Sequence, residues 1–187
     1  MYKNISWINS FLSGSVAMAL LSINLPSKAV KAPDGTVAFE SGIALVDAYA
    51  TFNGVRVRQA RYYFDLELPE DLGEPLKRVV IKQRTGGDEI DFKPGKTTAY
   101  IGDHRNKEEP LEVTAFVDET TAGITVEFDQ PIPPGNSLTV GIKPRRNPDY
   151  GGVYLFGVTA YPPGDKPVGL YLGPGRLHFY QGNDFRL

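Results

Sequence analysis

The chain has no cysteine, and its 187 residues include only two methionines, two histidines and one tryptophan. Without cysteine it has no disulfide, no thiolate metal site and no cysteine nucleophile. The formal net charge of −2 shows no basic excess, so nucleic acid and anionic membranes are not expected as partners, because both select for basic surfaces. No glycine-rich phosphate loop leads into a helix, which argues against nucleotide binding.

Residue types that carry catalysis are also sparse. After residues 1–29, Ser41 and Ser137 are the only serines, and neither lies in the G-x-S-x-G context of a nucleophile elbow. A serine triad with His104 or His178 therefore has little support. The two histidines are far apart in sequence, which gives a transition metal no ligand cluster. We predict no cofactor and no metal, and the pattern favours a non-enzymatic protein.

Two groups of carboxylates keep other chemistry open. Asp65 and Glu67 lie on one face of an expected strand, as a glycosidase pair would, although a solvated strand face explains them without catalysis. Asp88, Glu89 and Asp91 offer oxygen ligands of the kind that calcium uses, but their spacing matches no known calcium loop. Neither group carries a prediction of a site.

Residues 1–29 read as a secretory signal peptide. Lys3 gives a short basic start, residues 4–27 carry no charge, and the apolar run VAMALL occupies residues 16–21. Ser27 and Ala29 are the small residues that signal peptidase requires before a cut after Ala29, and Ala32 offers a second cut. A retained anchor is the alternative, but the polar residues within this segment weaken it, because a stable span needs about 20 mainly apolar residues. We expect no stable membrane span in the mature chain.

What the chain does contain is turn residues between short apolar runs. Its 20 glycines and 15 prolines separate about nine segments that are rich in β-branched and aromatic residues. This pattern predicts an all-β fold, a single antiparallel β-sandwich of immunoglobulin-like type over residues 30–180. Residues 181–187 are expected to form a flexible tail, and residues 70–74 a short turn of helix.

Residues 147–180 are the most strongly patterned stretch. The run VYLFGVTA at residues 153–160 lies between Gly-Gly and Pro-Pro-Gly and predicts a strand buried on both faces. Gly157 within it indicates a bulge or a close backbone approach, and Pro174 between two glycines predicts a turn or a crossing.

Two earlier segments carry clear strand signals. Residues 62–68 alternate, so that Tyr62, Phe64 and Leu66 face the core while Tyr63, Asp65 and Glu67 face solvent. Asn53-Gly54 is the strongest hairpin signal in the chain and predicts a tight turn between strands at 43–52 and 55–58. A second hairpin is predicted to join residues 111–117 to residues 124–128.

A low-specificity binding patch is the one site that the sequence suggests. The densest basic group is followed closely by several tyrosines, whose rings suit interfaces because they carry a polar tip. If these side chains face solvent together, they form a surface for an acidic partner or an anionic glycan; a solvated turn and buried rings are the plain alternative. The patch comprises Lys143, Arg145, Arg146, Tyr150, Tyr154, Tyr161 and Tyr171.

Several stretches also resemble a known family. NPDYGGVYLFGVTAYPPG followed by GLYLGPGRLHFY, together with PIPPGNSLTVGIKPRRNP and YYFDLELPEDLGEPLKRVVI, resemble the cyanobacterial family called domain of unknown function 2808. The resemblance covers nearly all of the chain after residue 33. It implies a cyanobacterial source and an extracytoplasmic location, in the periplasm or cell envelope or else the thylakoid lumen. It supplies no catalytic or ligand residues.

These inferences lead to an exported binding or accessory domain whose partner is an envelope protein or glycan. The alternative is an envelope carbohydrate-binding module or glycan-active enzyme, and a self-associating structural component is a third possibility. The sequence leaves the oligomeric state open.

Overall fold

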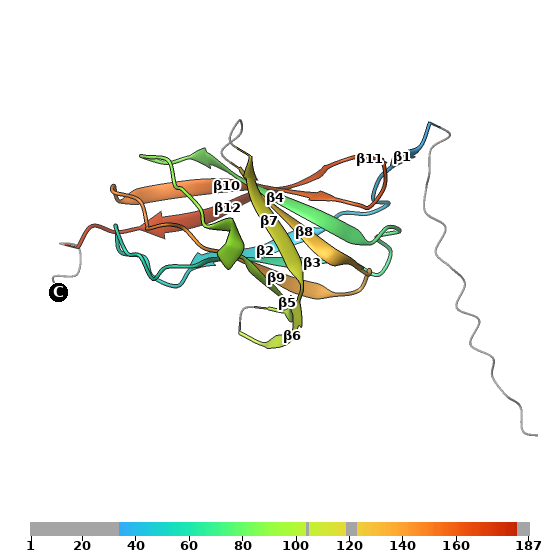
Figure 1. Ribbon diagram of the computed structural model, residues 1–187, viewed down its shortest axis with the longest axis horizontal. Coiled ribbons are helices and arrows are strands. Elements are labelled where there is room, and N and C mark those ends of the chain that lie inside the picture. Colours follow the sequence, from blue (N-terminus) through green and yellow to red (C-terminus); the bar gives the residue numbers. More distant parts are fainter. Residues whose placement is uncertain (1–33, 104, 119–122, 183–187) are drawn as a thin grey trace, which may run out of the picture.

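The computed structural model describes residues 34–103, 105–118 and 123–182. These residues form twelve strands and one short 3-10 helix, η1 (Pro94–Lys96), and ten of the strands make two five-stranded antiparallel sheets (Figure 1). The sheets pack face to face around one apolar core. The predicted all-β, immunoglobulin-like antiparallel sandwich is confirmed.

Each sheet combines strands that are distant in sequence. The first has the order β12-β10-β4-β8-β7, with bounds β4 (Leu76–Thr85), β7 (Val113–Asp118), β8 (Gly123–Ile132), β10 (Gly152–Tyr161) and β12 (Leu170–Phe179). The second has the order β2-β3-β9-β5-β6, with bounds β2 (Ala44–Ala50), β3 (Tyr62–Glu67), β5 (Thr98–Gly102), β6 (Lys107–Leu111) and β9 (Ser137–Ile142). A parallel pair, β1 (Thr36–Val37) and β11 (Lys166–Pro167), lies at one end.

The core is filled by alternate side chains of β3 and β10, because successive residues of a strand point to opposite faces. Tyr154 and Phe156 on β10 meet Tyr62 and Phe64 on β3, and the rings of Phe64 and Phe156 lie 6.1 Å apart. All four side chains are fully buried. Each such burial contributes roughly 1.5–3 kcal/mol of transfer free energy, so this layer contributes substantially to stability.

The two sheets come close along β12 and β2. Gly175 on β12 faces the core, and a Cβ atom there would lie 2.7 Å from the Phe64 ring and 2.8 Å from the Cβ atom of Ala48. Only a residue without a side chain fits this approach.

Strand β3 differs from the prediction on its outer face. Tyr62, Phe64 and Leu66 face the core as predicted, but Tyr63 and Asp65 are 7% and 5% exposed rather than solvated. Side chains of the neighbouring strands cover this face. The Thr139 hydroxyl lies 2.8 Å from the Asp65 carboxylate, and the Tyr49 ring stacks on Tyr63. The predicted solvent face is therefore wrong for these two residues and holds for Glu67.

Strand β10 is an interior strand of its sheet, between β12 and β4, but only one of its faces is fully buried. On the other face Val153 is 37% exposed, so the prediction of burial on both faces is wrong; the described residues place no second layer over it. The close approach predicted at Gly157 is confirmed. A Cβ there would lie 2.7 Å from the Arg84 side chain and 3.1 Å from the Tyr171 ring.

Pro174 lies inside a continuous strand rather than in a turn. It pairs with Gly157 in the ladder between β12 and β10. β12 is the edge strand of its sheet and pairs only with β10. A residue without an N–H therefore breaks no hydrogen bond to a second strand, and β12 tolerates the proline.

The tight turn predicted at Asn53-Gly54 is also wrong. β2 ends at Ala50 and β3 begins at Tyr62, so a long loop joins them. Its backbone groups pair elsewhere: the Val55 N–H donates to Tyr180 and the Arg56 N–H to Pro148. The hairpin predicted between residues 111–117 and 124–128 is confirmed as the antiparallel pairing of β7 with β8. Residues 70–74 form a turn and not a helix.

The signal peptide predicted at residues 1–29 lies outside the described residues, and so does the predicted tail from residue 183 onward. Both stay predictions, as do the boundaries of the domain at residues 30 and 180. In the part of the chain that the structure describes, no helix is long and apolar enough to cross a membrane.

Candidate functional site

Three loops gather at one end of the sandwich, which we call the basic end. They span residues 51–61, 86–97 and 143–151, and they lie at the left of Figure 1, next to the C-terminal segment. These loops contain eight basic and four acidic residues, which gives them a net charge of +4. The basic residues are Arg56, Arg58, Arg61, Lys93, Lys96, Lys143, Arg145 and Arg146.

Asn147 is buried and joins the loop at 143–151 to the loop at 51–61. Its side-chain nitrogen donates to the carbonyls of Phe52 and Gly54, at 2.8 and 2.7 Å. Its side-chain oxygen accepts from the Tyr62 hydroxyl at 2.9 Å. Its own N–H donates to the Val57 carbonyl. Because every polar group of this side chain is satisfied without water, the loop positions are fixed by the protein itself.

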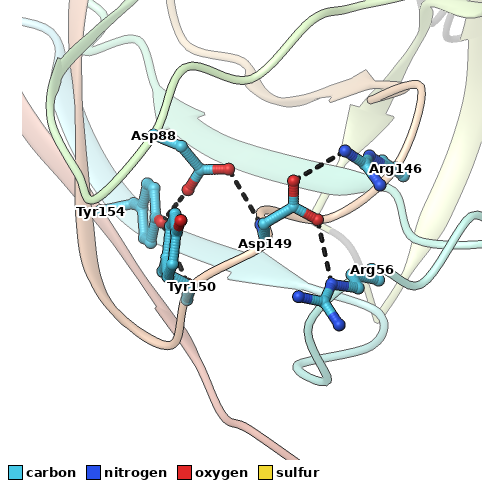
Figure 2. A network of polar contacts seen from close by, with 6 residues as sticks. All are labelled: Arg56, Asp88, Arg146, Asp149, Tyr150 and Tyr154. Carbon is cyan, nitrogen blue, oxygen red and sulfur yellow. Dashed lines mark hydrogen bonds and ion pairs between the residues drawn. The ribbon is translucent and has the colours of Figure 1, made fainter.

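A second network fixes the start of β10 (Figure 2). The Tyr154 hydroxyl donates to one carboxylate oxygen of Asp88, and the other oxygen accepts the N–H of Asp149 at 2.9 Å. The same hydroxyl lies 3.0 Å from the Tyr150 carbonyl. Burial of the phenol and, as the smaller cause, its hydrogen bond to Asp88 raise the pKa of Tyr154 to about 12. The phenol is therefore a neutral donor at physiological pH.

Asp149 links two arginines at the surface. Its carboxylate accepts from Arg56 at 3.0 Å and from Arg146 at 2.7 Å, as Figure 2 shows. Arg56 adopts a left-handed backbone with φ of 60°, which few residues other than glycine take up. The hydrogen bond from its N–H to Pro148 and the contact with Asp149 hold this conformation. One carboxylate thus serves two guanidinium groups.

The loop at 86–97 is clamped to the loop at 143–151 by backbone pairing. The Lys93 N–H donates to the Lys143 carbonyl, and the Arg145 N–H donates to the Asp91 carbonyl, both at 2.8 Å. Gln83 adds a side-chain clamp, because its amide nitrogen donates to the Asp88 carbonyl at 2.7 Å. Lys93 and Arg145 are therefore presented from a short two-stranded segment rather than from independent loops.

A hollow of about 480 Å³ opens between these segments. Arg58, Lys93 and Arg145 line it with exposed side chains. Within the described ranges, none of the three has a carboxylate at ion-pair distance. The lining also holds four acidic residues: Asp88 is bonded to the Tyr154 hydroxyl and the Asp149 N–H, the Asp149 carboxylate pairs with Arg56 and Arg146, and Glu89 and Asp91 make no ion pair with the three cations. The three cations are available for an anionic group from outside.

Two other basic side chains of this end serve the fold. The Lys143 ammonium donates to the carbonyls of Arg58 and Ala60, each at 2.8 Å. Desolvation lowers the pKa of Lys143, and the charges of Arg61 and Lys93 lower it further. The Arg61 guanidinium donates to the Lys96 carbonyl at 2.7 Å. Both side chains therefore stabilise the loops and have little left to offer a ligand.

The structure divides the predicted patch into three groups. Arg145, Arg146 and Tyr150 lie at the basic end, and Tyr150 is 58% exposed. Lys143 supports the loop beside them. Tyr154 is fully buried, which corrects its place in a surface patch: its ring points into the core and packs against Phe179 at 5.3 Å.

The remaining two tyrosines lie on the outer face of the first sheet. Tyr171, on β12, is 51% exposed, and the Arg84 guanidinium lies 5.8 Å from its ring centre. Tyr161, at the end of β10, is half-buried, with the Arg78 guanidinium 4.4 Å from its ring centre. They form a surface of their own, apart from the basic end.

Several residues of the basic end were not predicted. Arg56, Arg58 and Lys93 come from loops that are distant in sequence from the basic run, and only the fold brings them to it. Asn147 carries no sequence signal beyond its place before Pro148. Among the described residues, no three histidine or acidic side chains are placed to hold a metal ion.

Several solved structures are distantly similar to this chain. The chain is similar to the collagen-binding subdomain of the Enterococcus faecalis surface protein ACE, with 10% identity and a TM-score of 0.41 over 71% of this chain and 93% of that one. It is also similar to the collagen-binding domain of a Staphylococcus aureus adhesin, with 15% identity and a TM-score of 0.37 over 71% and 97%. A cohesin module from Clostridium perfringens gives 9% identity and a TM-score of 0.33 over 74% and 97%.

A search of curated proteins finds no match to the sequence. A family profile, by contrast, covers the whole sandwich from β1 to the end of β12. It matches residues 36–179, well over half of the chain, and the chain belongs to the family described as protein of unknown function DUF2808.

Proposed function

We propose that this protein is an exported, non-enzymatic binding or accessory domain of the cyanobacterial periplasm or cell envelope, and that it docks an acidic protein partner on its basic end. The proposed location rests on the signal-peptide pattern of residues 1–29 and on the implied source of the family. The mode of recognition rests on the geometry of the basic end.

The observation that carries the proposal is a set of three cations held on fixed loops without partners. Arg58, Lys93 and Arg145 share one hollow, and no carboxylate of the described residues pairs with them. Glu89 and Asp91 also line the hollow, but neither carboxylate comes within ion-pair distance of the three cations, so a partner that reaches them gains the charge pairing that the described residues do not supply. The hydrogen bonds of Asn147 and Asp88 fix the loops before binding, which reduces the entropy lost on association.

The rim of this surface also suits a protein partner. Tyr150 exposes more than half of its side chain beside the hollow, and Phe52 on the neighbouring loop is 51% exposed. Aromatic residues and arginine are enriched where proteins bind one another, because they combine apolar area with polar contacts. An acidic protein surface would therefore meet both charge and apolar area here.

In-cell crosslinking followed by mass spectrometry tests the proposal. We expect a defined partner with crosslinks at Lys93 or Lys96. The double substitution Arg58→Glu and Arg145→Glu should lower its capture about tenfold or more, which corresponds to at least about 1.4 kcal/mol. Arg176→Glu, an exposed arginine on β12, is the matched control and should leave capture unchanged. Equal loss with the control, or no loss with the double variant, would contradict the proposal.

Determination of the N-terminus of the isolated protein tests the proposed export. A mature start at Val30 or Pro33 is expected from the two cleavage sites. A protein that is recovered only with Met1 in place would argue against export through this signal.

A second candidate is glycan binding on the outer face of the first sheet, the carbohydrate-binding alternative. The Tyr171 ring approaches Gly157 and the Tyr161 ring approaches Gly169, where the absence of a Cβ lets each ring lie close to the sheet. Rings that lie on a sheet in this way can stack on a sugar. The test is binding of envelope polysaccharide, which Tyr171→Ala should reduce and Arg145→Glu should not. The enzyme version needs Asp65 and Glu67 as a pair, and Asp65 is already engaged by Thr139.

A further inference from the structure

The end of the sandwich opposite the basic end is acidic. Four segments meet there, residues 34–42, 68–75, 133–136 and 162–169, at the right of Figure 1 where β1 and β11 lie. These segments contain six carboxylates and one lysine, Lys166, which gives a net charge of −5. We call this the acidic end. The carboxylates are Asp34, Glu40, Glu70, Asp71, Glu74 and Asp165.

Glu74 separates this end from an ordinary solvated surface. Its side chain is nine-tenths buried, with 6% of the residue exposed. Its Oε1 atom has no hydrogen-bond partner among the residues that the structure describes. A buried carboxylate oxygen without a donor is costly, so the position calls for a cation or a strong donor from outside.

The surroundings of Glu74 give such a donor a place to enter. Glu74 lines a hollow of about 390 Å³ together with Asp165, whose carboxylate is exposed. The rest of the lining is small or apolar, with Gly35, Val37 and Gly164 among it. Lys166 does not fill the hollow with its charge, because its ammonium donates to the Asp34 carbonyl at 3.1 Å.

We propose that the acidic end receives the basic end of a second copy of this chain, with an arginine or lysine side chain entering the hollow at Glu74. The proposal rests on the proposed function only in that it uses the same basic end. The two ends are complementary in charge, +4 against −5, and each carries what the other lacks: unpaired cations at one, an unpaired buried carboxylate oxygen at the other.

The geometry makes this association directional. The two surfaces are different and lie at opposite ends of the long axis, so a pair of copies still has one free end of each kind (Figure 1). Head-to-tail contacts of this kind grow into chains or rings and do not stop at a symmetric dimer. Because the attraction is between exposed charges, it weakens as salt shortens the Debye length.

Sedimentation velocity of the full chain tests the association. From micromolar to millimolar protein, we expect the average mass to rise at about 0.02 M salt and to fall back to the monomer at about 0.5 M salt. A protein that stays monomeric over this whole range overturns the proposal. It would leave the proposed function standing, because that function is tested by capture of a different protein.

Charge reversal tests the direction of the contact. The first variant carries Arg58→Glu and Arg145→Glu, and the second carries Glu70→Lys and Asp165→Lys; all four positions are exposed. Each variant alone should be monomeric. Mixed, the intact acidic end of the first should bind the intact basic end of the second and give a 1:1 complex that does not grow further. Variants that still associate alone, or a mixture that stays monomeric while the native chain associates, overturn it. Arg176→Glu is the control and should associate like the native chain.

Glu74→Gln tests the role of the buried carboxylate with little change of shape. We expect weaker association, because the cation loses its partner, together with a higher midpoint of thermal unfolding for the monomer. Unchanged association in this variant would mean that the contact does not use the hollow at Glu74, and would overturn the proposal as stated.

Discussion

The Tyr62 hydroxyl, buried at the end of β3, donates a hydrogen bond of 2.9 Å to the side-chain oxygen of Asn147 in the loop before β10. This bond joins the two sheets at the basic end. Asn147→Ala leaves the Tyr62 hydroxyl and two loop carbonyls without partners, so we expect the free energy of unfolding to fall by about 2–4 kcal/mol. Urea denaturation measures it, and Asn106→Ala in an exposed loop is the control. A loss below about 0.5 kcal/mol would contradict the role given to Asn147.

Removal of the Tyr154 hydroxyl should loosen the loop at residues 147–151. Tyr154→Phe keeps the ring in the core but leaves one carboxylate oxygen of Asp88 without its donor, so we expect a loss of about 1–3 kcal/mol. Faster hydrogen exchange at the Asp149 N–H, which is bonded to the same carboxylate, would locate the effect. Loss of stability without faster exchange at this position would show that Asp88 does not depend on Tyr154.

The raised pKa of Tyr154 also predicts a pH dependence. The folded pKa of about 12 lies above the unfolded value of about 10, so the folded state holds the proton more tightly. The resulting stability is fully present below about pH 10 and is lost as the pH rises toward 12. We expect the native protein to lose stability across this window and Tyr154→Phe to lose less. Burial raises the pKa of Tyr62 as well, so part of the dependence should remain in the variant.

Lys143 and Arg145 are two residues apart but should behave differently. Lys143→Ala leaves the carbonyls of Arg58 and Ala60 without their donor, and we expect a loss of about 1–2 kcal/mol in unfolding free energy. Arg145→Ala should change stability by less than about 0.5 kcal/mol, because its side chain is exposed and unpaired. Thermal and urea unfolding of both variants check this. Equal losses would mean that the Arg145 side chain is also structural.

Gly175 should tolerate no side chain. A methyl group there would press on the Phe64 ring and on Ala48, so Gly175→Ala is expected to destabilise the protein by about 1–3 kcal/mol. Gly42→Ala is the matched control, because nothing lies within 4 Å of a Cβ at that position. If Gly175→Ala is as stable as the control, the two sheets are able to move apart at this edge.

Period-two patterns were sufficient to predict the fold class and most core faces. The alternation of residues 62–68 gave Tyr62, Phe64 and Leu66 as core residues, and all three are buried. Local patterns failed where a neighbouring strand decides the environment. Asp65 reads as a solvent-facing carboxylate, and only its placement beside Thr139 shows that it is buried.

The basic end could be predicted only in part, because its contacts are long-range. The basic run at residues 143–146 is visible in the sequence, and Arg145 and Arg146 do face the hollow. Its partners are not visible, because Arg58 and Lys93 arrive from other loops. The Asn53-Gly54 signal failed for the same reason: Asn147 and Tyr180 take up the backbone groups that a tight hairpin would have paired internally.

The long range of these contacts has a consequence for the order of folding. The side chain of Asn147 bonds to carbonyls 93 and 95 residues earlier, and the Val55 N–H pairs with Tyr180 close to the end of the described chain. Contacts between residues so distant in sequence form late, because the loop that they close is costly in entropy. We therefore expect the basic end to be completed late in folding, once residues 53–55 have paired with Tyr180. A chain cut short before Tyr180 would keep its core residues but lose the two backbone bonds that tie Asn53 and Val55 to Tyr180, so we expect the loop at residues 51–61 to loosen and the basic end to be less well ordered.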